Sequence, residues 1–333
     1  MSLLEVTDLQ VEYASPRGAF KAVDGVSFSI ERGEIFGLAG ESGCGKSTTA
    51  FGISRLLRPP ARLAGGRVLF DGQELTGMPE LAFQAFRWSR MSVVLQSAMN
   101  NLNPVMRVGS QLTDVILAHE PGTSARDAWS RAESLLALVE LPADRLRSYP
   151  HELSGGMRQR VVIAMSLALR PDLIIMDEPT TALDVVTQQG IVRRIVELKK
   201  ELGFAVLFIT HDLPLMLEIC DRIGIMYAGK MAEIGRADRL LRGARHPYTQ
   251  GLLRAFPSLT GPKVRIAGIP GSPPDLVSPP AGCRFQPRCA HAVAACSAAQ
   301  PAMTAADAGG SVACHLYETE EAGHEPVAAS RQR

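Results

Sequence analysis

The sequence predicts an α/β fold built around a largely parallel sheet. Two apolar, strand-like runs, LIIMDE and AVLFIT, each follow a segment in which apolar residues recur at helical spacing, and this alternation is typical of a parallel sheet. A third run, EIFGLAG, ends in glycines that lead into the helical pattern GCGKSTTAFGISRLL. Strand, loop and helix therefore follow one another at this point of the chain.

Before this sheet the chain predicts β structure, and within it a helical insert. LLEVTDLQVEY and AVDGVSFSI are strand-like stretches separated by the loop ASPRG. From about Arg87 to Pro150 the pattern becomes helical. The apolar stripe that indicates this consists of Ala128, Ala132, Leu135, Leu136 and Val139. We expect the helical insert to cover about residues 97–160.

The 333 residues are enough for two domains at about 150 residues each. We expect a first domain over residues 1–260. The stretch GIPGSPPDLVSPPAG is rich in proline and glycine and is typical of a linker. It introduces a small appended domain over residues 261–320, followed by a disordered end over residues 321–333.

Composition excludes several classes of function. The 35 basic and 34 acidic residues leave a formal charge of +1, too little to hold a nucleic-acid backbone. No apolar run reaches the roughly 18 residues of a membrane span, since VVIAMSLAL stops at Arg170. Glu5 and Asp8 lie where a secretion signal would be basic and then apolar. We expect a cytoplasmic chain that contacts membranes only through a partner.

The segment GESGCGKS, residues Gly40 to Ser47, fits a phosphate-binding loop. Glycines such as Gly45 let successive N–H groups point at phosphate oxygens, and the following helix adds its partial positive charge. Lys46 is placed to reach the β- and γ-phosphates, and the Ser47 hydroxyl to bind Mg²⁺. The other loop residues assigned to the nucleotide are Ser42, Gly43 and Thr48.

The strand LIIMDEP ends in two adjacent carboxylates, Asp177 and Glu178. Neighbouring residues on a strand face opposite ways, so the two should do different work. Asp177 suits Mg²⁺, and Glu178 suits a general base that takes a proton from an attacking water.

The segment LSGGMRQR predicts a second anion-binding helix start, formed by Ser154, Gly155 and Gly156. Its hydroxyl and free N–H groups require a phosphate of their own. Since Lys46 already serves one nucleotide, we expect this start to serve the nucleotide of another molecule.

Together these motifs resemble those of ATP-binding-cassette transporter ATPases over about residues 3–260. The resemblance implies a RecA-like core with an antiparallel β subdomain and a helical subdomain, and ATP and Mg²⁺ as ligands. It further implies roles for single residues. Tyr13 would stack on adenine, with Phe20 as a competing choice, and Gln96 in VVLQ would sense Mg²⁺ and the attacking water. Asp184 in TALD would lie in a loop crossing a dimer interface. His211 in FITHD would contact the γ-phosphate.

The same resemblance implies two ATPase domains packed head to tail. Each ATP would lie between the phosphate loop of one domain and the Ser154 helix start of the other. ATP binding would then close the pair and hydrolysis would open it.

Two features narrow the resemblance to ATPase subunits of oligopeptide and dipeptide importers: the motif RHPYTQGLL at residues 245–253 and the late cysteines. The motif HPYTQGLL alone predicts only a helix that begins at a proline. The implied partners are a homologous ATPase in a heterodimer, two transmembrane permeases and an extracytoplasmic binding protein, which place the chain on the cytoplasmic face of the membrane. Oligosaccharide or metal-chelate cargo is the alternative. Ser97 and Ala98 depart from the family's QDPMTSLNP pattern, which weakens the assignment of a peptide.

Two further classes stay open. One is a soluble cassette ATPase of translation or DNA repair, but the tandem cassettes or long coiled-coil insert typical of those proteins are missing from this sequence. The other is a redox enzyme built on the cysteines, but the sequence has no flavin or nicotinamide fingerprint.

Four of the six cysteines lie near the end of the chain: Cys283, Cys289, Cys296 and Cys314. A reducing compartment argues against disulfides, and GCRFQPRCAH is too polar for an ordinary core. The gaps of five, six and seventeen residues differ from the close ligand pairs of a zinc site and suit an iron–sulfur cluster better. His291 and His315 are the substitute ligands.

The resemblance implies a [4Fe–4S] cluster at these four thiols, with zinc as the alternative. We expect the group to staple a domain too small for a core of its own. On this hypothesis its loss would loosen the segment and leave basal ATPase activity intact.

Overall fold

The computed structural model describes residues 2–96, 101–181, 183–255, 268–306 and 309–318. The strands are β1 Ser2–Tyr13, β2 Phe20–Glu31, β3 Ile35–Ala39, β4 Ala61–Phe70, β5 Gln73–Glu74, β6 Met91–Val94, β7 Leu173–Asp177, β8 Ala205–Ile209, β9 Arg222–Tyr227, β10 Lys230–Arg236, β11 Thr304–Ala306 and β12 Gly310–Val312. The α-helices are α1 Lys46–Ile53, α2 Glu80–Phe86, α3 Val108–His119, α4 Ala125–Leu138, α5 Gly155–Ser166, α6 Val185–Leu202, α7 Leu213–Ile219, α8 Ala237–Gly243, α9 Pro247–Arg254 and α10 Ala294–Ala298. Short 3-10 turns are η2 Ala143–Arg147, η3 Pro150–Glu152 and η4 Gln286–Arg288.

The strands form two sheets. A four-stranded sheet in the order β2-β1-β4-β5 is antiparallel throughout. An eight-stranded sheet follows the order β11-β12-β10-β9-β3-β8-β7-β6. Its β9-β3-β8-β7-β6 part is parallel, and β10, β12 and β11 extend it in antiparallel fashion. The predicted parallel sheet and the preceding β structure are both present.

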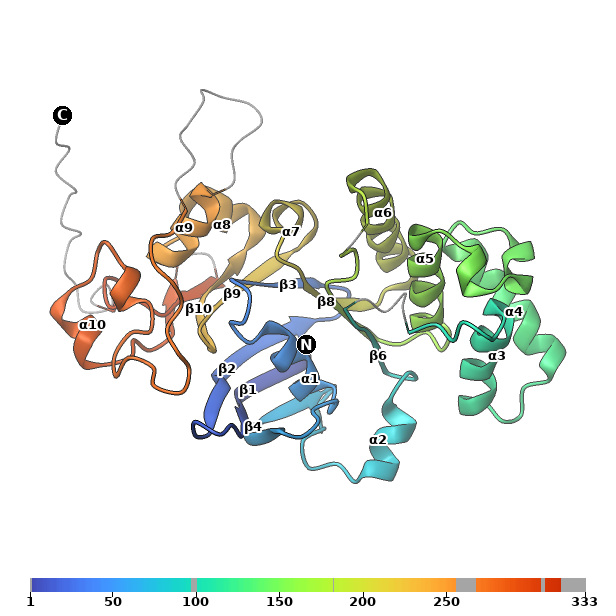
Figure 1. Cartoon of the computed structure of the whole chain (residues 1–333), viewed down its shortest axis with the longest axis horizontal. Helices are drawn as coiled ribbons and strands as arrows, with labels where there is room; N and C mark the ends of the chain where they lie inside the picture. The colour runs from blue at the N-terminus through green and yellow to red at the C-terminus, as the bar shows by residue number, and fades with distance from the viewer. Residues whose placement is uncertain (1, 97–100, 182, 256–267, 307–308, 319–333) are drawn as a thin grey trace.

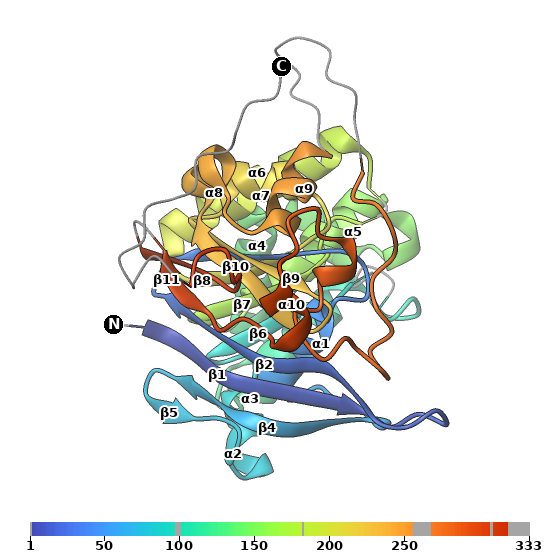
Figure 2. The ribbon, with the colours of Figure 1, turned by 90° about the vertical axis from the view of Figure 1, so that its left-hand side faces the viewer.

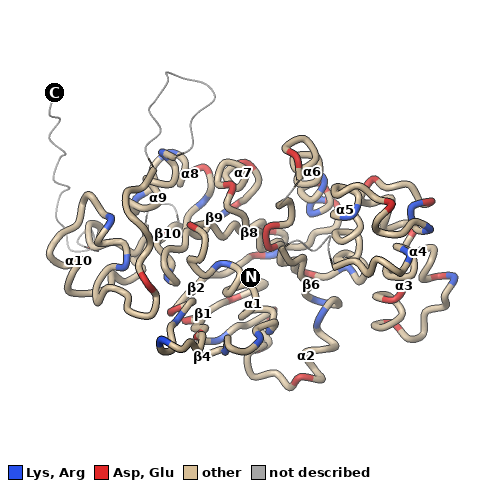
Figure 3. Tube along the Cα trace, in the orientation of Figure 1, with Lys and Arg blue, Asp and Glu red and all other residues tan. Residues whose placement is uncertain are grey.

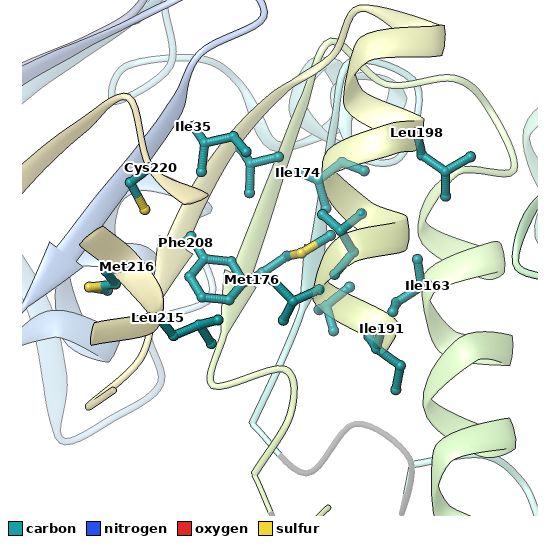
Figure 4. Close-up of a cluster of buried hydrophobic side chains, with 14 of the residues drawn as sticks. Ile35, Ile163, Ile174, Met176, Ile191, Leu198, Phe208, Leu215, Met216 and Cys220 are labelled. Carbon is teal, nitrogen blue, oxygen red and sulfur yellow. The ribbon is translucent and has the colours of Figure 1, made fainter. Parts of the chain in front are cut away.

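The parallel strands are buried on both faces, as their continuous apolar sequences predict. Ile174 and Met176 of β7 pack against the side covered by α5 and α6, whereas Ile175 belongs to the cluster with β1, β2 and α1. Figure 4 shows the first cluster, in which Phe208 of β8 lies beside Met176 and faces the helices. Both faces of the sheet are therefore closed, and only its edges and strand ends can carry a site.

Helices α3, α4 and α5 lie together at one end of the molecule (Figure 1). The stripe predicted along α4 is buried, with Ala128, Ala132 and Leu136 fully inside. Ser124 caps this helix by accepting a hydrogen bond from the Asp127 N–H. Helices α3 and α4 and the first half of α5 lie in the range expected for the helical insert, about residues 97–160. Ser97 and Ala98 lie outside the described residues.

Residues 268–318, named here the tail, pack against the other end of the large sheet (Figure 2). Strand β12 pairs with β10, where Glu233 lies opposite Val312. Cys283, Phe285 and Cys296 belong to the same buried cluster as Phe208 and Tyr248. A segment of this size buries too little apolar surface alone, so it shares the sheet and core of the preceding residues. The predicted disordered end at residues 321–333 lies outside the described residues.

Basic and acidic residues are interspersed along the chain in the view of Figure 3, which agrees with the near-zero formal charge. No helix among the described residues has both the length and the apolar character needed to span a bilayer.

Candidate nucleotide-binding site

The phosphate loop connects the end of β3, at Ala39, to the start of α1, at Lys46. Its backbone requires glycine at two close approaches. A Cβ atom on Gly40 would lie 2.2 Å from the Met226 carbonyl oxygen, and one on Gly45 would lie 2.4 Å from that of Ala22. Both glycines also have positive φ values, 147° and 109°. The loop is therefore packed against β9 and β2 in one fixed conformation.

The Lys46 ammonium is held over this loop. Its side chain is buried, and Nζ donates hydrogen bonds to the carbonyl oxygens of Gly40, at 2.8 Å, and Glu41, at 3.0 Å. Both acceptors belong to the loop itself, so the charge lies where the loop's N–H groups would receive a phosphate.

Asp177 lies at the buried end of β7. Only 1% of its surface is exposed, and Oδ1 has no hydrogen-bond partner among the described residues. Burial raises the pKa of this carboxyl, against a hydrogen bond from Ser47 that lowers it. An unpartnered buried carboxylate oxygen beside a serine hydroxyl is the donor set that Mg²⁺ prefers in nucleotide sites.

Glu178, the next residue, has different surroundings from Asp177. Its φ of 46° is uncommon for a residue with a side chain, and its N–H donates to the Ile209 carbonyl, 2.8 Å away. The carboxylate accepts from the Thr181 hydroxyl at 2.8 Å and from Gln96 Nε2 at 3.2 Å. His211 Nδ1 lies 3.4 Å from Oε1. Three residues from separate strand ends therefore converge on one carboxylate.

A cavity of about 500 Å³ lies above these groups. Most of the predicted site residues line it: Tyr13, Ser42, Gly43, Gly45, Lys46, Ser47, Thr48, Gln96, Glu178 and His211. The rings of Tyr13 and Phe20 stack on each other with centroids 5.6 Å apart, so the two aromatic residues weighed for adenine both line the cavity. Leu276 of the tail also lines it, which the sequence motifs did not indicate.

Gly40 and Asp177, described above, do not line this cavity, and the other four predicted residues lie outside it at the starts of α5 and α6. Ser154 Oγ accepts from the Met157 N–H at 3.3 Å, and Asp184 accepts from the Thr187 N–H at 2.9 Å. A Cβ atom on Gly156 would lie 2.5 Å from Thr187 Cγ2. Gly155 begins α5 beside them. These residues cap and pack two helix starts, and they line no wall of their own chain's cavity.

Two further contacts on the phosphate loop escaped sequence reasoning. The Tyr248 hydroxyl accepts a hydrogen bond from the Glu41 N–H at 2.8 Å. Arg288 donates to both carboxylate oxygens of Glu41, at 2.8 and 2.9 Å. The motif HPYTQGLL was the available signal for Tyr248, because a tyrosine in a short amphipathic helix is expected to place its hydroxyl on a partner.

The four late cysteines line one cavity of about 10 Å³ together with His246, His291 and His315. All four are free thiols. Burial raises the pKa of Cys283 and Cys289, and that of Cys314 to about 11. Among the described residues, no group of three or more histidine, cysteine or acidic side chains has an arrangement that could hold a metal ion.

Two family models match the chain. The ABC transporter model matches residues 23–181, and the model "Oligopeptide/dipeptide transporter, C-terminal region" matches residues 232–296.

Curated relatives match nearly the whole chain. The oligopeptide transport ATP-binding protein OppD of Salmonella typhimurium is 46% identical, with 90% of this chain and 89% of that protein covered. The dipeptide transport ATP-binding protein DppD of Bacillus subtilis is 41% identical, with 95% of each covered. Among solved structures, the dimeric post-hydrolysis state of the ATP-binding cassette MJ0796 with ADP and Pi superposes with a TM-score of 0.63 and 27% identity, over 70% of this chain and 98% of that one.

Proposed function

The chain belongs to the ATP-binding subunits of the oligopeptide and dipeptide importers of the ABC transporter family, and on that premise we propose how its residues bind and hydrolyse ATP. The observation that carries the proposal is the convergence of Gln96, Glu178 and His211 above the phosphate loop, in one cavity with Lys46. It supports hydrolysis in this chain's own site.

Binding begins with the phosphate loop and the stacked aromatic pair. The loop N–H groups and the Lys46 ammonium receive the β- and γ-phosphates, and the α1 helix start adds its partial positive charge. At the other end of the cavity, Tyr13 and Phe20 offer an apolar wall for adenine. Ser42, Gly43 and Thr48 complete the loop side.

Glu178 is the general base. Its carboxylate lies on the cavity surface, where it can accept a proton from a water attacking the γ-phosphate. Gln96 Nε2 and the Thr181 hydroxyl donate to Oε2, which fixes the orientation of the carboxylate. His211, largely exposed beside Oε1, is free to turn toward the γ-phosphate.

The residues present fit a Mg²⁺ ion, because the unpartnered Asp177 Oδ1 lies beside the Ser47 hydroxyl. Ser47, Gln96 and Asp177 would hold it. When bound, Mg²⁺ neutralises charge on the transferred phosphoryl group. The buried Asp177 thereby gains the counter-charge that its own chain does not supply at Oδ1.

A second ATPase completes the site. Ser154, Gly155, Gly156 and Asp184 lie outside the chain's own cavity, at the starts of α5 and α6. This placement supports a head-to-tail pair in which they face the partner's nucleotide. The solved relative MJ0796 is itself dimeric. We assign the partner as a homologous ATPase in a heterodimer.

The names of the relatives support the remaining assembly. We assign two permeases and an extracytoplasmic binding protein as the further partners of a transport ATP-binding subunit, and the chain would lie peripherally on the cytoplasmic face of the membrane. Residues 1–260 form the ATPase unit and residues 261–320 the C-terminal unit in this assignment. We assign peptides as the cargo class. Oligosaccharides or metal chelates are the alternative, because Ser97 and Ala98 depart from the family's QDPMTSLNP pattern.

We propose, from the resemblance, that Cys283, Cys289, Cys296 and Cys314 hold a [4Fe–4S] cluster. Four free thiols and no disulfide surround one space. Zinc is the weaker alternative, because the gaps of five, six and seventeen residues between these cysteines differ from the close ligand pairs of a zinc site. Such a cluster would cross-link Cys296 of α10 to the loops that carry Cys283, Cys289 and Cys314.

The base assignment is tested with Glu178→Gln. The amide cannot accept the proton of water, so ATP turnover should fall by about 10²-fold or more while ATP binding persists. The variant should accumulate as a closed, ATP-bound ATPase pair on size-exclusion chromatography. Glu197→Gln, on the exposed face of α6, is the matched control and should hydrolyse ATP normally. Near-normal turnover in Glu178→Gln would show that another residue is the general base.

The cluster is tested by anaerobic purification. We expect brown protein with about four irons per chain, and loss of colour in Cys289→Ser. Cys220→Ser, a buried cysteine outside the tail, should keep the iron. Colourless anaerobic protein with one zinc per chain would contradict the assignment.

A further inference from the structure

Glu41 is held by four partners, two of which lie outside the phosphate loop. Arg288 of the tail binds its carboxylate through two nitrogen–oxygen pairs. Tyr248 of α9 accepts from its N–H. Lys46 Nζ and the Cys44 N–H donate to its carbonyl oxygen, and these two bonds are internal to the loop. The position of this residue, between Gly40 and the nucleotide-facing Ser42, is therefore set largely by the C-terminal third of the chain.

Arg288 is itself fixed before it reaches Glu41. Its side chain is only 5% exposed. Nε donates to the Pro270 carbonyl at 2.8 Å, and Nη1 donates to the Tyr227 hydroxyl at 3.2 Å. The guanidinium also lies against the rings of Tyr227 and Phe285, with centroids 5.7 and 6.0 Å away. The paired hydrogen bonds to Glu41 hold the pKa of Arg288 above its ordinary value, so its charge is permanent.

A carboxylate at Glu41 would oppose nucleotide binding if it were unpaired. ATP brings several negative charges to the loop beside it, and like charges at short range in a partly buried site repel strongly. The bidentate pair with Arg288 cancels the charge of Glu41 and orients its peptide.

We propose that Arg288 is a positioning residue for ATP binding: through Glu41 it neutralises and shapes the phosphate loop, so that the tail forms part of the nucleotide site. The inference rests on the proposed nucleotide site. Arg288 touches neither ATP nor the catalytic carboxylate and acts only through Glu41.

The connection extends to the cysteine cavity. Arg288 is followed directly by Cys289, which lines that cavity, while Phe285 lines it and also contacts the guanidinium. A change in the tail therefore reaches the phosphate loop through Arg288. By thermodynamic reciprocity, ATP binding should also stabilise the tail. On this proposal, loosening of the tail would weaken ATP binding.

The test measures the Kd of ATP on the purified full chain by isothermal titration calorimetry. Arg288→Met keeps the length of the side chain but leaves Glu41 unpaired, and should raise the Kd by about 10-fold. Adding Glu41→Gln removes the uncompensated charge, so the double variant should recover most of that loss. Arg288→Lys keeps the charge but not the paired geometry, and should raise the Kd by about threefold. In the assembled importer, KM for ATP should rise in the same proportion while kcat changes by less than about threefold.

Arg17→Gln is the matched control, because it removes an exposed ion pair between the N-terminal sheet and Asp275 of the tail. It should leave the Kd unchanged. A purely structural role for Arg288 predicts that Glu41→Gln does not rescue Arg288→Met, and that result would overturn the proposal. If Arg288→Met fails to fold, an unchanged Kd in Arg288→Lys overturns it instead. Lys46→Ala distinguishes failure of the proposed nucleotide site from failure of this inference. A wild-type Kd in Lys46→Ala would contradict the nucleotide site itself. A raised Kd in Lys46→Ala together with a wild-type Kd in the Arg288 variants would contradict only the role of Arg288.

Discussion

The two glycine-rich helix starts of this chain differ in what surrounds them. The start of α1 lies under a cavity of about 500 Å³, with Lys46 over the loop and the carboxylate of Glu178 opposite. The start of α5, at Ser154, lines no part of that cavity. Its hydroxyl caps its own helix, and no basic residue lies in the first position of that helix. The α1 start has a cavity, a lysine and a carboxylate beside it, whereas the α5 start has its N–H groups, the Ser154 hydroxyl and Arg158 in its first turn.

This difference shows how one fold divides a reaction between two molecules. The α1 start receives support from its own chain, including Glu41, Tyr248 and Arg288. The α5 start can act only when another chain brings the phosphates. Each half is therefore incomplete in a different way, and ATP becomes the contact that joins them.

The largest expected effect comes from disabling both starts in one chain. In the assembled importer, Lys46→Ala should remove hydrolysis at one composite site, and Ser154→Arg should remove it at the other. The double variant should fall to background, about 10²-fold or more below wild type. ATP turnover in membrane vesicles is the measurement. A double variant no worse than Lys46→Ala would mean that both residues serve the same site, and the comparison of the two starts would fail.

A smaller effect is expected at Gly156. Alanine there would meet Thr187 Cγ2 at 2.5 Å, and crowding of this kind costs about 1–3 kcal/mol, so Tm should fall by several degrees. Turnover should fall by about tenfold, because the added methyl also blocks the approach of a phosphate.

Thr187→Ser separates these two causes, since it removes Cγ2 and keeps the hydroxyl that donates to Asp184. In Gly156→Ala/Thr187→Ser, Tm should return to the wild-type value while turnover stays low. Recovery of both would show that Gly156 serves helix packing alone.

The smallest effect concerns Leu276, the tail residue that lines the nucleotide cavity near Tyr13 and Phe20. Leu276→Ala removes apolar surface from one side of the cavity, and should raise KM for ATP by about two- to fivefold with kcat unchanged. Val277→Ala, one residue along the tail and outside the cavity, is the matched control. An unchanged KM in Leu276→Ala would limit the contribution of the tail to the phosphate end of the site.

Much of the fold and of the site followed from short patterns. The phosphate loop needed only glycine spacing and a lysine, because the chemistry of a helix start is local. Strand alternation predicted different surroundings for Asp177 and Glu178, and the structure buries the first and places the second on the cavity surface. The strand ends at Asp177, however, and Glu178 reaches the cavity with a φ of 46°. The buried stripe of α4 followed from its helical period.

The sequence by itself therefore determined the kind of site and the family, because those depend on residues that are neighbours along the chain. Only the tertiary structure decided what holds the phosphate loop. Arg288 and Glu41 are 247 residues apart in the sequence, and Tyr248 and Glu41 are 207 apart. Periodicity carries no information about such pairs. Arg288 reaches Glu41 because the tail, which cannot bury a core of its own, packs on β10. What reads as an appended segment in the sequence becomes, through that packing, part of the site for ATP.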